Sequence, residues 1–171
     1  MYFLMKLSFP DRLRLAWELT WPLALADLAA VVLFHGVIGT EGELLDTVWA
    51  VAAFFAVSPW VVRRAFRRER IVAVRNGKQL PQLDYQQSIK VIWLLAWRTI
   101  PLGLLALLAV SAAFRFTGTS LPSVTTKDPL VNAFGLSVVD TIASLVLYPV
   151  LIPGMLKKRY RGFHLELRPA K

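Results

Sequence analysis

The sequence contains no cysteine and is poor in charge. Of its 171 residues, 18% are charged and 56% are hydrophobic. Without cysteine there is no disulfide framework, no thiolate metal site and no cysteine nucleophile. An apolar fraction this high exceeds that of an ordinary soluble domain. The composition therefore indicates a protein whose solvent is a lipid bilayer.

Catalytic motifs are also missing. The chain has none of the zinc-protease, serine-hydrolase, P-loop or dinucleotide-binding strings, whose spacing places reactive groups together. The histidines, His35 and His164, lie far apart in the sequence, and the topology derived below puts them on opposite membrane faces. We therefore expect no enzyme activity, no cofactor and no metal site.

A net charge of +9 raises the question of a nucleic-acid partner. A nucleic-acid-binding domain carries its Lys and Arg as a patch or stripe on a soluble fold. Here the cations cluster at the ends of apolar runs instead. We expect no nucleic-acid partner.

Four apolar runs are long enough to consider as membrane spans, at residues 17–39, 47–62, 91–114 and 130–156. A helix needs about 20 residues to cross the hydrocarbon core. The second run has only 16 residues, about 24 Å of helix, so its flanking arginines must snorkel or its membrane must thin. The sequence predicts an all-α membrane protein, with residues 1–171 forming one membrane domain of four transmembrane helices arranged as two hairpins.

The orientation follows from the distribution of cations. Seventeen of the 20 Lys and Arg residues lie in the N-terminal segment, the 63–90 loop and the 157–171 tail. Short loops rich in Lys and Arg stay in the cytoplasm, so we expect both termini to be cytoplasmic and the membrane to be a bacterial inner membrane. Such clusters bind anionic lipid headgroups or partner proteins; the cations expected to form this surface are Arg63, Arg64, Arg67, Arg68, Arg70, Lys157, Lys158, Arg159 and Arg161.

The two halves of the chain resemble each other weakly. "TWPLAL" at residues 20–25 and "TIPLGL" at residues 99–104 agree at four of six positions. Pro59 and Pro149 precede a pair of cations by the same spacing. Either one hairpin was duplicated, which gives parallel repeats related by an axis along the membrane normal, or apolar composition and shared membrane constraints produce the match.

The cytoplasmic arms contain strand signals. Asn76-Gly77 separates "IVAVR" from "KQLPQL", and this dipeptide is a strong two-residue hairpin signal. In the tail, Phe163, Leu165 and Leu167 alternate with polar residues, the period of a half-covered strand. We expect a small cytoplasmic β-strand pair formed by the middle loop and the tail. The alternative is an irregular basic loop held by lipid headgroups.

Ionisable residues within the apolar runs are functional-site candidates, because they are costly in a bilayer. Counted from the cytoplasmic anchors, Arg98 lies about 12 Å deep, Asp27 about 15 Å, Asp140 about 26 Å and His35 about 27 Å. This count pairs Arg98 with Asp27, whereas alignment of the two halves pairs Arg98 with Glu18. These residues either fix helix register as buried polar contacts or form a proton or ion relay.

Two functions follow from these observations. The small soluble part and the absence of motifs favour a non-catalytic accessory, scaffold or assembly subunit of a larger membrane complex, with the lipid bilayer and other membrane subunits as partners. The alternative is a small homo-oligomeric transporter or channel that uses the intramembrane carboxylates Asp27 and Asp140.

Overall fold

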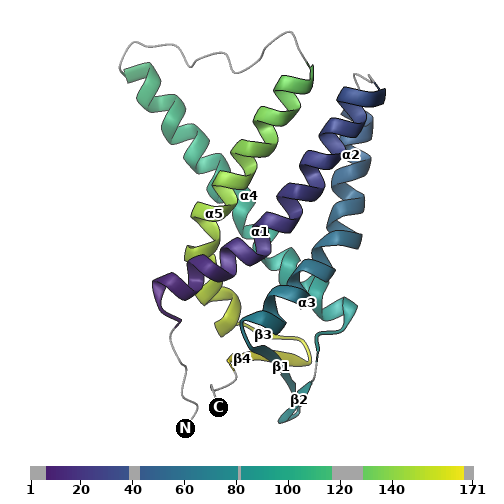
Figure 1. Cartoon of the computed structure of the whole chain (residues 1–171). Helices are drawn as coiled ribbons and strands as arrows, with labels where there is room; N and C mark the ends of the chain where they lie inside the picture. The colour runs from purple at the N-terminus through teal and green to yellow at the C-terminus, as the bar shows by residue number, and fades with distance from the viewer. Residues whose placement is uncertain (1–6, 39–42, 81, 117–128, 168–171) are drawn as a thin grey trace.

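The computed structural model describes residues 7–38, 43–80, 82–116 and 129–167. These form long helices and a small sheet (Figure 1). In chain order the elements are α1 (Phe9–Val31), the π-helix η1 (Val32–Ile38), α2 (Glu43–Ala52), the π-helix η2 (Ala53–Val57), α3 (Ser58–Arg68), β1 (Ile71–Arg75), β2 (Lys78–Leu80), α4 (Tyr85–Phe116), α5 (Pro129–Lys157), β3 (Arg159–Tyr160) and β4 (Phe163–Leu167).

Four helical segments are long and apolar enough to cross a bilayer. They are Phe9–Ile38, Leu44–Arg68, Tyr85–Leu105 and Leu130–Lys157. The first and third begin earlier than predicted, and the second extends at both ends, because turns that contain polar or charged residues continue the helices. The first begins at a capping box, in which the Ser8 hydroxyl accepts from the Asp11 backbone N–H and the Asp11 carboxylate accepts from the Ser8 backbone N–H; this satisfies two otherwise unpaired donors.

The π-helix η2 has a local cause in Pro59. Proline has no N–H, so the Phe55 carbonyl four residues earlier has no helical donor. The Tyr85 hydroxyl, at the start of α4, donates to that carbonyl at 2.8 Å. The Ser58 N–H bonds the Ala53 carbonyl five residues back, which is the π pattern. A hydroxyl from another helix thus replaces the missing backbone donor.

The sheet has four antiparallel strands in the order β2-β1-β4-β3. Its central pair, β1 and β4, joins the middle loop to the tail, with Ala73 opposite Leu165, as predicted. Arg75 pairs with Lys78 across a two-residue turn. Asn76 and Gly77 both adopt positive φ, 51° and 76°, as this hairpin turn requires. The irregular-loop alternative is wrong, and β2 and β3 extend the expected pair to four strands.

The hydrophobic core lies between the sheet and the adjoining ends of the helices, a region we call the sheet end (Figure 1). One face of the sheet contributes Ile71, Ala73 and Leu165 to it. The helices contribute large side chains with at most 1% of their surface exposed: Leu15, Leu19, Val61, Val62, Phe66, Val91, Leu95, Ile152 and Met155. The most extensive helix pair is α1 with α5.

The opposite end of the helices, the far end, is more open. Figure 1 shows α4 diverging from α5 away from the sheet. Among the side chains of α4 that the structure describes, none beyond Leu95 is buried, and Leu104, Leu105 and Leu108 are each more than half exposed. The helices are thus held together mainly at the sheet end.

Candidate functional site

Asp27 of α1 and Asp140 of α5 line one cavity of about 160 Å³ between the helices. Counting along the sequence placed Asp27 about 15 Å and Asp140 about 26 Å deep, whereas the structure brings both residues to the wall of one cavity. The count took Trp17 as the start of the first span, whereas α1 begins at Phe9 and crosses α5 obliquely (Figure 1).

The rest of the cavity wall carries aromatic and hydroxyl groups. The indole N–H of Trp49, from α2, donates to Asp27 Oδ1 at 3.2 Å. Tyr148 and Ser144 of α5, both buried, contribute hydroxyl groups to the wall. Thr20 of α1 is 4% exposed and its hydroxyl has no hydrogen-bond partner. Sequence reasoning missed these residues, because they come from three segments and form no motif.

His35 has a carboxylate partner that the sequence did not suggest. Its Nε2 lies 3.1 Å from Asp46 Oδ1, so the contact joins η1 to α2. The His35 side chain is 6% exposed, and its Nδ1 is buried without a partner. This pair is consistent with a buried contact that fixes how two helices meet.

Glu18 and Asp27, the predicted partners of Arg98, contact other side chains in the structure. Glu18 binds Arg64 and Arg68 instead, and Asp27 accepts from Trp49. The Arg98 guanidinium lies against α5, where a methyl group at Gly154 would be 2.6 Å from Arg98 Nη1. Two features explain these contacts. Helix α3 supplies Arg64 and Arg68 to Glu18, and Gly154, which has no side chain, leaves space for the Arg98 guanidinium.

Arg98 is also close to Tyr160 of β3. Burial raises the pKa of the Tyr160 hydroxyl, and the positive charge of Arg98 offsets part of that rise. The hydroxyl donates to the Met155 carbonyl at 3.3 Å near the end of α5. Arg98 therefore sits at the junction between α4, α5 and the sheet.

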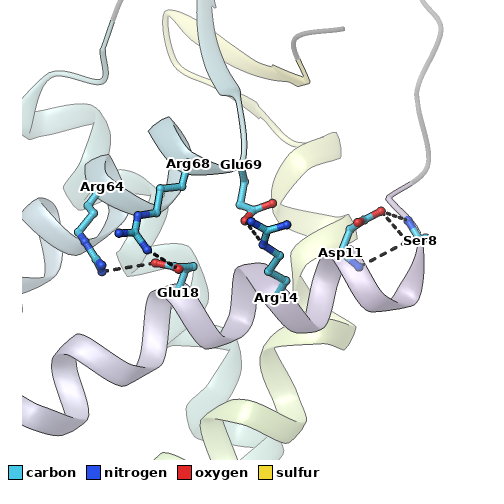
Figure 2. A network of polar contacts seen from close by, with 7 residues as sticks. All are labelled: Ser8, Asp11, Arg14, Glu18, Arg64, Arg68 and Glu69. Carbon is cyan, nitrogen blue, oxygen red and sulfur yellow. Dashed lines mark hydrogen bonds and ion pairs between the residues drawn. The ribbon is translucent and has the colours of Figure 1, made fainter. Parts of the chain in front are cut away.

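A network of ion pairs joins α1 to α3 at the sheet end (Figure 2). Glu18, with 12% of its side chain exposed, lies 2.8 Å from Arg68 and 3.4 Å from Arg64. One turn nearer the start of α1, Arg14 lies 3.0 Å from Glu69. The Arg64 guanidinium also covers the Trp21 ring at 4.6 Å, a cation–π contact. Arg64 and Arg68 of α3 therefore hold α3 against α1.

The predicted basic surface divides into two groups. Arg64 and Arg68 contact Glu18, and Arg63 donates to the Pro59 carbonyl at 3.2 Å. The remaining predicted cations are exposed at the sheet end: Arg67, Arg70, Lys157, Lys158, Arg159 and Arg161. The exposed members lie on both arms, at the end of α3 and at the end of α5, beside the sheet.

The described parts of the chain contain no group of three or more His, Cys, Asp or Glu side chains placed to hold a metal ion. In the part of the chain that the structure describes, ionisable side chains gather in the polar cavity and on the basic surface of the sheet end. No family model, no curated protein and no solved structure matches this chain.

Proposed function

We propose that this protein is a non-catalytic integral membrane protein that acts as an accessory, scaffold or assembly subunit of a larger membrane complex. Its four apolar helices would cross the membrane as two hairpins, with the sheet end in the cytoplasm of a bacterial cell. The supporting observations are the placement of charge, the packing of the helices and the apolar surface they leave uncovered.

The placement of charge supports the orientation. The exposed arginines and lysines gather at the sheet end, on α3, on the β1–β2 hairpin and after α5. Anionic headgroups of the cytoplasmic leaflet attract such residues. The sheet, which ties the two arms together through β1 and β4, would then lie against the cytoplasmic face of the membrane.

The far half of α4 is the observation that carries the proposal. This half diverges from α5 (Figure 1), and its described leucines, among them Leu104, Leu105 and Leu108, remain exposed. Ala52 and Ala56, four residues apart on the second apolar helix, are also exposed, and small residues at this spacing let another helix approach closely. We assign these surfaces to helices of partner subunits.

Gentle detergent extraction followed by mass spectrometry of co-purifying proteins tests this function. The expected result is a defined set of other membrane proteins that co-purify with the wild-type chain. Leu108→Trp should reduce that co-purification, because a larger side chain obstructs close helix packing. The matched control is Leu136→Trp on α5, which is 68% exposed against 65% for Leu108 and should leave the set unchanged. A homodimer without other proteins would overturn the proposal.

The cavity supports a second candidate, a small homo-oligomeric transporter or channel. Asp27 and Asp140 line one cavity between the helices, and carboxylates within membrane-spanning segments line ion pathways in known membrane proteins. Under this function Asp27→Asn and Asp140→Asn abolish ion-coupled flux in proteoliposomes while assembly persists. Under the subunit function the same changes lower partner recovery or abundance. Unchanged flux together with unchanged assembly would contradict both roles for these carboxylates.

A further inference from the structure

We propose that the cavity lined by Asp27 and Asp140 binds a hard metal cation. Carboxylate and hydroxyl oxygens would coordinate the ion, which would keep some of its bound water molecules. This site is independent of the subunit function proposed above, because it lies inside a single chain and can be measured on the purified protein.

The first argument is uncompensated charge. The described residues that line the cavity include Asp27 and Asp140 but no Lys, Arg or His. Trp49 offers Asp27 one neutral N–H, which leaves the charge itself in place. Asp27 is half-buried and Asp140 is exposed at the surface of the helices. Carboxylates at this position in an apolar, membrane-spanning segment are costly unless a positive charge compensates them. A cation in the cavity lies between the two groups that need it.

The second argument is Thr20. Thr20 lines the cavity and only 4% of its surface is exposed. Its buried hydroxyl has no hydrogen-bond partner. Buried polar atoms are paired in most structures, with protein or with ordered water. The Thr20 hydroxyl oxygen could coordinate the cation directly or form a hydrogen bond with one of the cation's waters. A proton shared between the two carboxylates would leave Thr20 without a partner.

The third argument is donor chemistry and space. The described wall carries the side-chain oxygens of Thr20, Asp27, Asp140, Thr141, Ser144 and Tyr148, together with the indole N–H of Trp49. The Thr141 hydroxyl already donates to the Ser137 carbonyl. Oxygen donors select hard cations such as Na⁺ or Ca²⁺ over soft transition metals. The volume of about 160 Å³ admits a cation and several waters, since one water needs about 10–15 Å³ of such space.

The test uses the full chain purified in detergent, with retention of ²²Na⁺ or ⁴⁵Ca²⁺ measured in choline chloride at constant ionic strength. Wild-type protein should retain one of the two ions with a saturable dependence on concentration. Asp27→Asn and Asp140→Asn should each weaken this binding at least about tenfold, because each removes a charged ligand. Thr20→Val, which replaces a hydroxyl with a methyl group, should weaken it roughly threefold.

Two controls separate the site from general effects. Asp46→Asn changes a carboxylate that pairs with His35 outside the cavity, and Thr99→Val removes a hydroxyl that bonds the Leu95 carbonyl; neither should alter ion retention. The same variants are unfolded thermally with and without the ion: wild type and the controls should gain the most stability from it, Thr20→Val less, and the two aspartate variants least. No retention of either ion by folded wild-type protein would overturn the proposal. Retention that survives Asp27→Asn and Asp140→Asn would overturn it as well.

Discussion

The sheet end and the far end of the helices differ in how their side chains are used. At the sheet end, large residues such as Phe66 and Met155 are almost fully buried among helices α1, α3, α4 and α5 and the sheet. At the far end, helix α4 stands apart and its leucines are exposed (Figure 1). The cavity with Asp27 and Asp140 lies between the helices and borders the buried core at Tyr148. The comparison suggests that stability is concentrated at the sheet end, which leaves the remainder free for binding.

The largest test of this comparison is truncation of matched phenylalanines. Phe66, 1% exposed, belongs to the sheet-end core, whereas Phe134 on α5 is 49% exposed. Phe66→Ala should lower the free energy of unfolding in mixed micelles by about 3–5 kcal/mol, because a buried cavity is left behind. Phe134→Ala should change it by less than about 0.5 kcal/mol. Equal losses would contradict the proposed concentration of stability.

The ion-pair network offers a smaller test within the sheet end. Glu18 contacts two arginines and Glu69 contacts one. Glu18→Gln should cost about 1–2 kcal/mol, discounted because Arg68 is half exposed. Glu69→Gln should cost less than about 0.5 kcal/mol, since its partner Arg14 is 72% exposed. Urea titration of both variants at low and high salt measures the difference, and a larger loss at Glu69 would refute the ranking.

The link between Tyr85 and η2 can be measured as a coupling. Tyr85→Phe should destabilise the protein by about 1 kcal/mol, because the Phe55 carbonyl loses its donor. In a Pro59→Ala background the new backbone N–H can reach that carbonyl, so the cost of Tyr85→Phe should disappear. A double-mutant cycle measured by unfolding isolates this term. If Tyr85→Phe costs the same stability in the wild-type and the Pro59→Ala backgrounds, the Tyr85 hydroxyl does not compensate for the missing backbone N–H of Pro59.

The smallest expected effect concerns two glycines of α5. An added methyl group at Gly135 meets no atom within 4 Å, whereas at Gly154 it would meet the guanidinium of Arg98. Gly135→Ala should therefore stabilise the helix by about 0.5–1 kcal/mol, through propensity alone. Gly154→Ala should lose that gain because Arg98 has to move. Thermal unfolding of both variants provides the comparison, and an equal gain at both positions would place Arg98 elsewhere.

The sequence predicted helices, turns and strands well where neighbouring residues determine them. The four apolar runs, the Asn76-Gly77 turn and the alternation of Phe163, Leu165 and Leu167 each depend on a few neighbouring residues, and each corresponds to an observed helix, turn or strand. The helix ends were less accurate, because charged residues such as Arg67 and Arg68 extend a helix beyond its apolar part. Apolar length alone does not mark where hydrogen bonding ends.

The predicted internal repeat stays a prediction. α1 packs on α5 and α4 packs on α3, so the first helix of each half contacts the second helix of the other half. The halves nevertheless differ in detail, because η2 interrupts the second apolar helix while α5 is one α-helix from Pro129 to Lys157.

The sequence by itself determined the apolar helices, the concentration of cations in the arms and the strands that follow them, because hydropathy and turn chemistry are set by neighbouring residues. The tertiary structure alone decided which ionisable groups meet. Glu18 binds cations of α3, Asp27 shares a cavity with Asp140, and Arg98 lies against Gly154. The tilt of α1 and the angles at which the helices cross bring these side chains together. The spacing of residues along one helix determines neither the tilt nor the crossing angles.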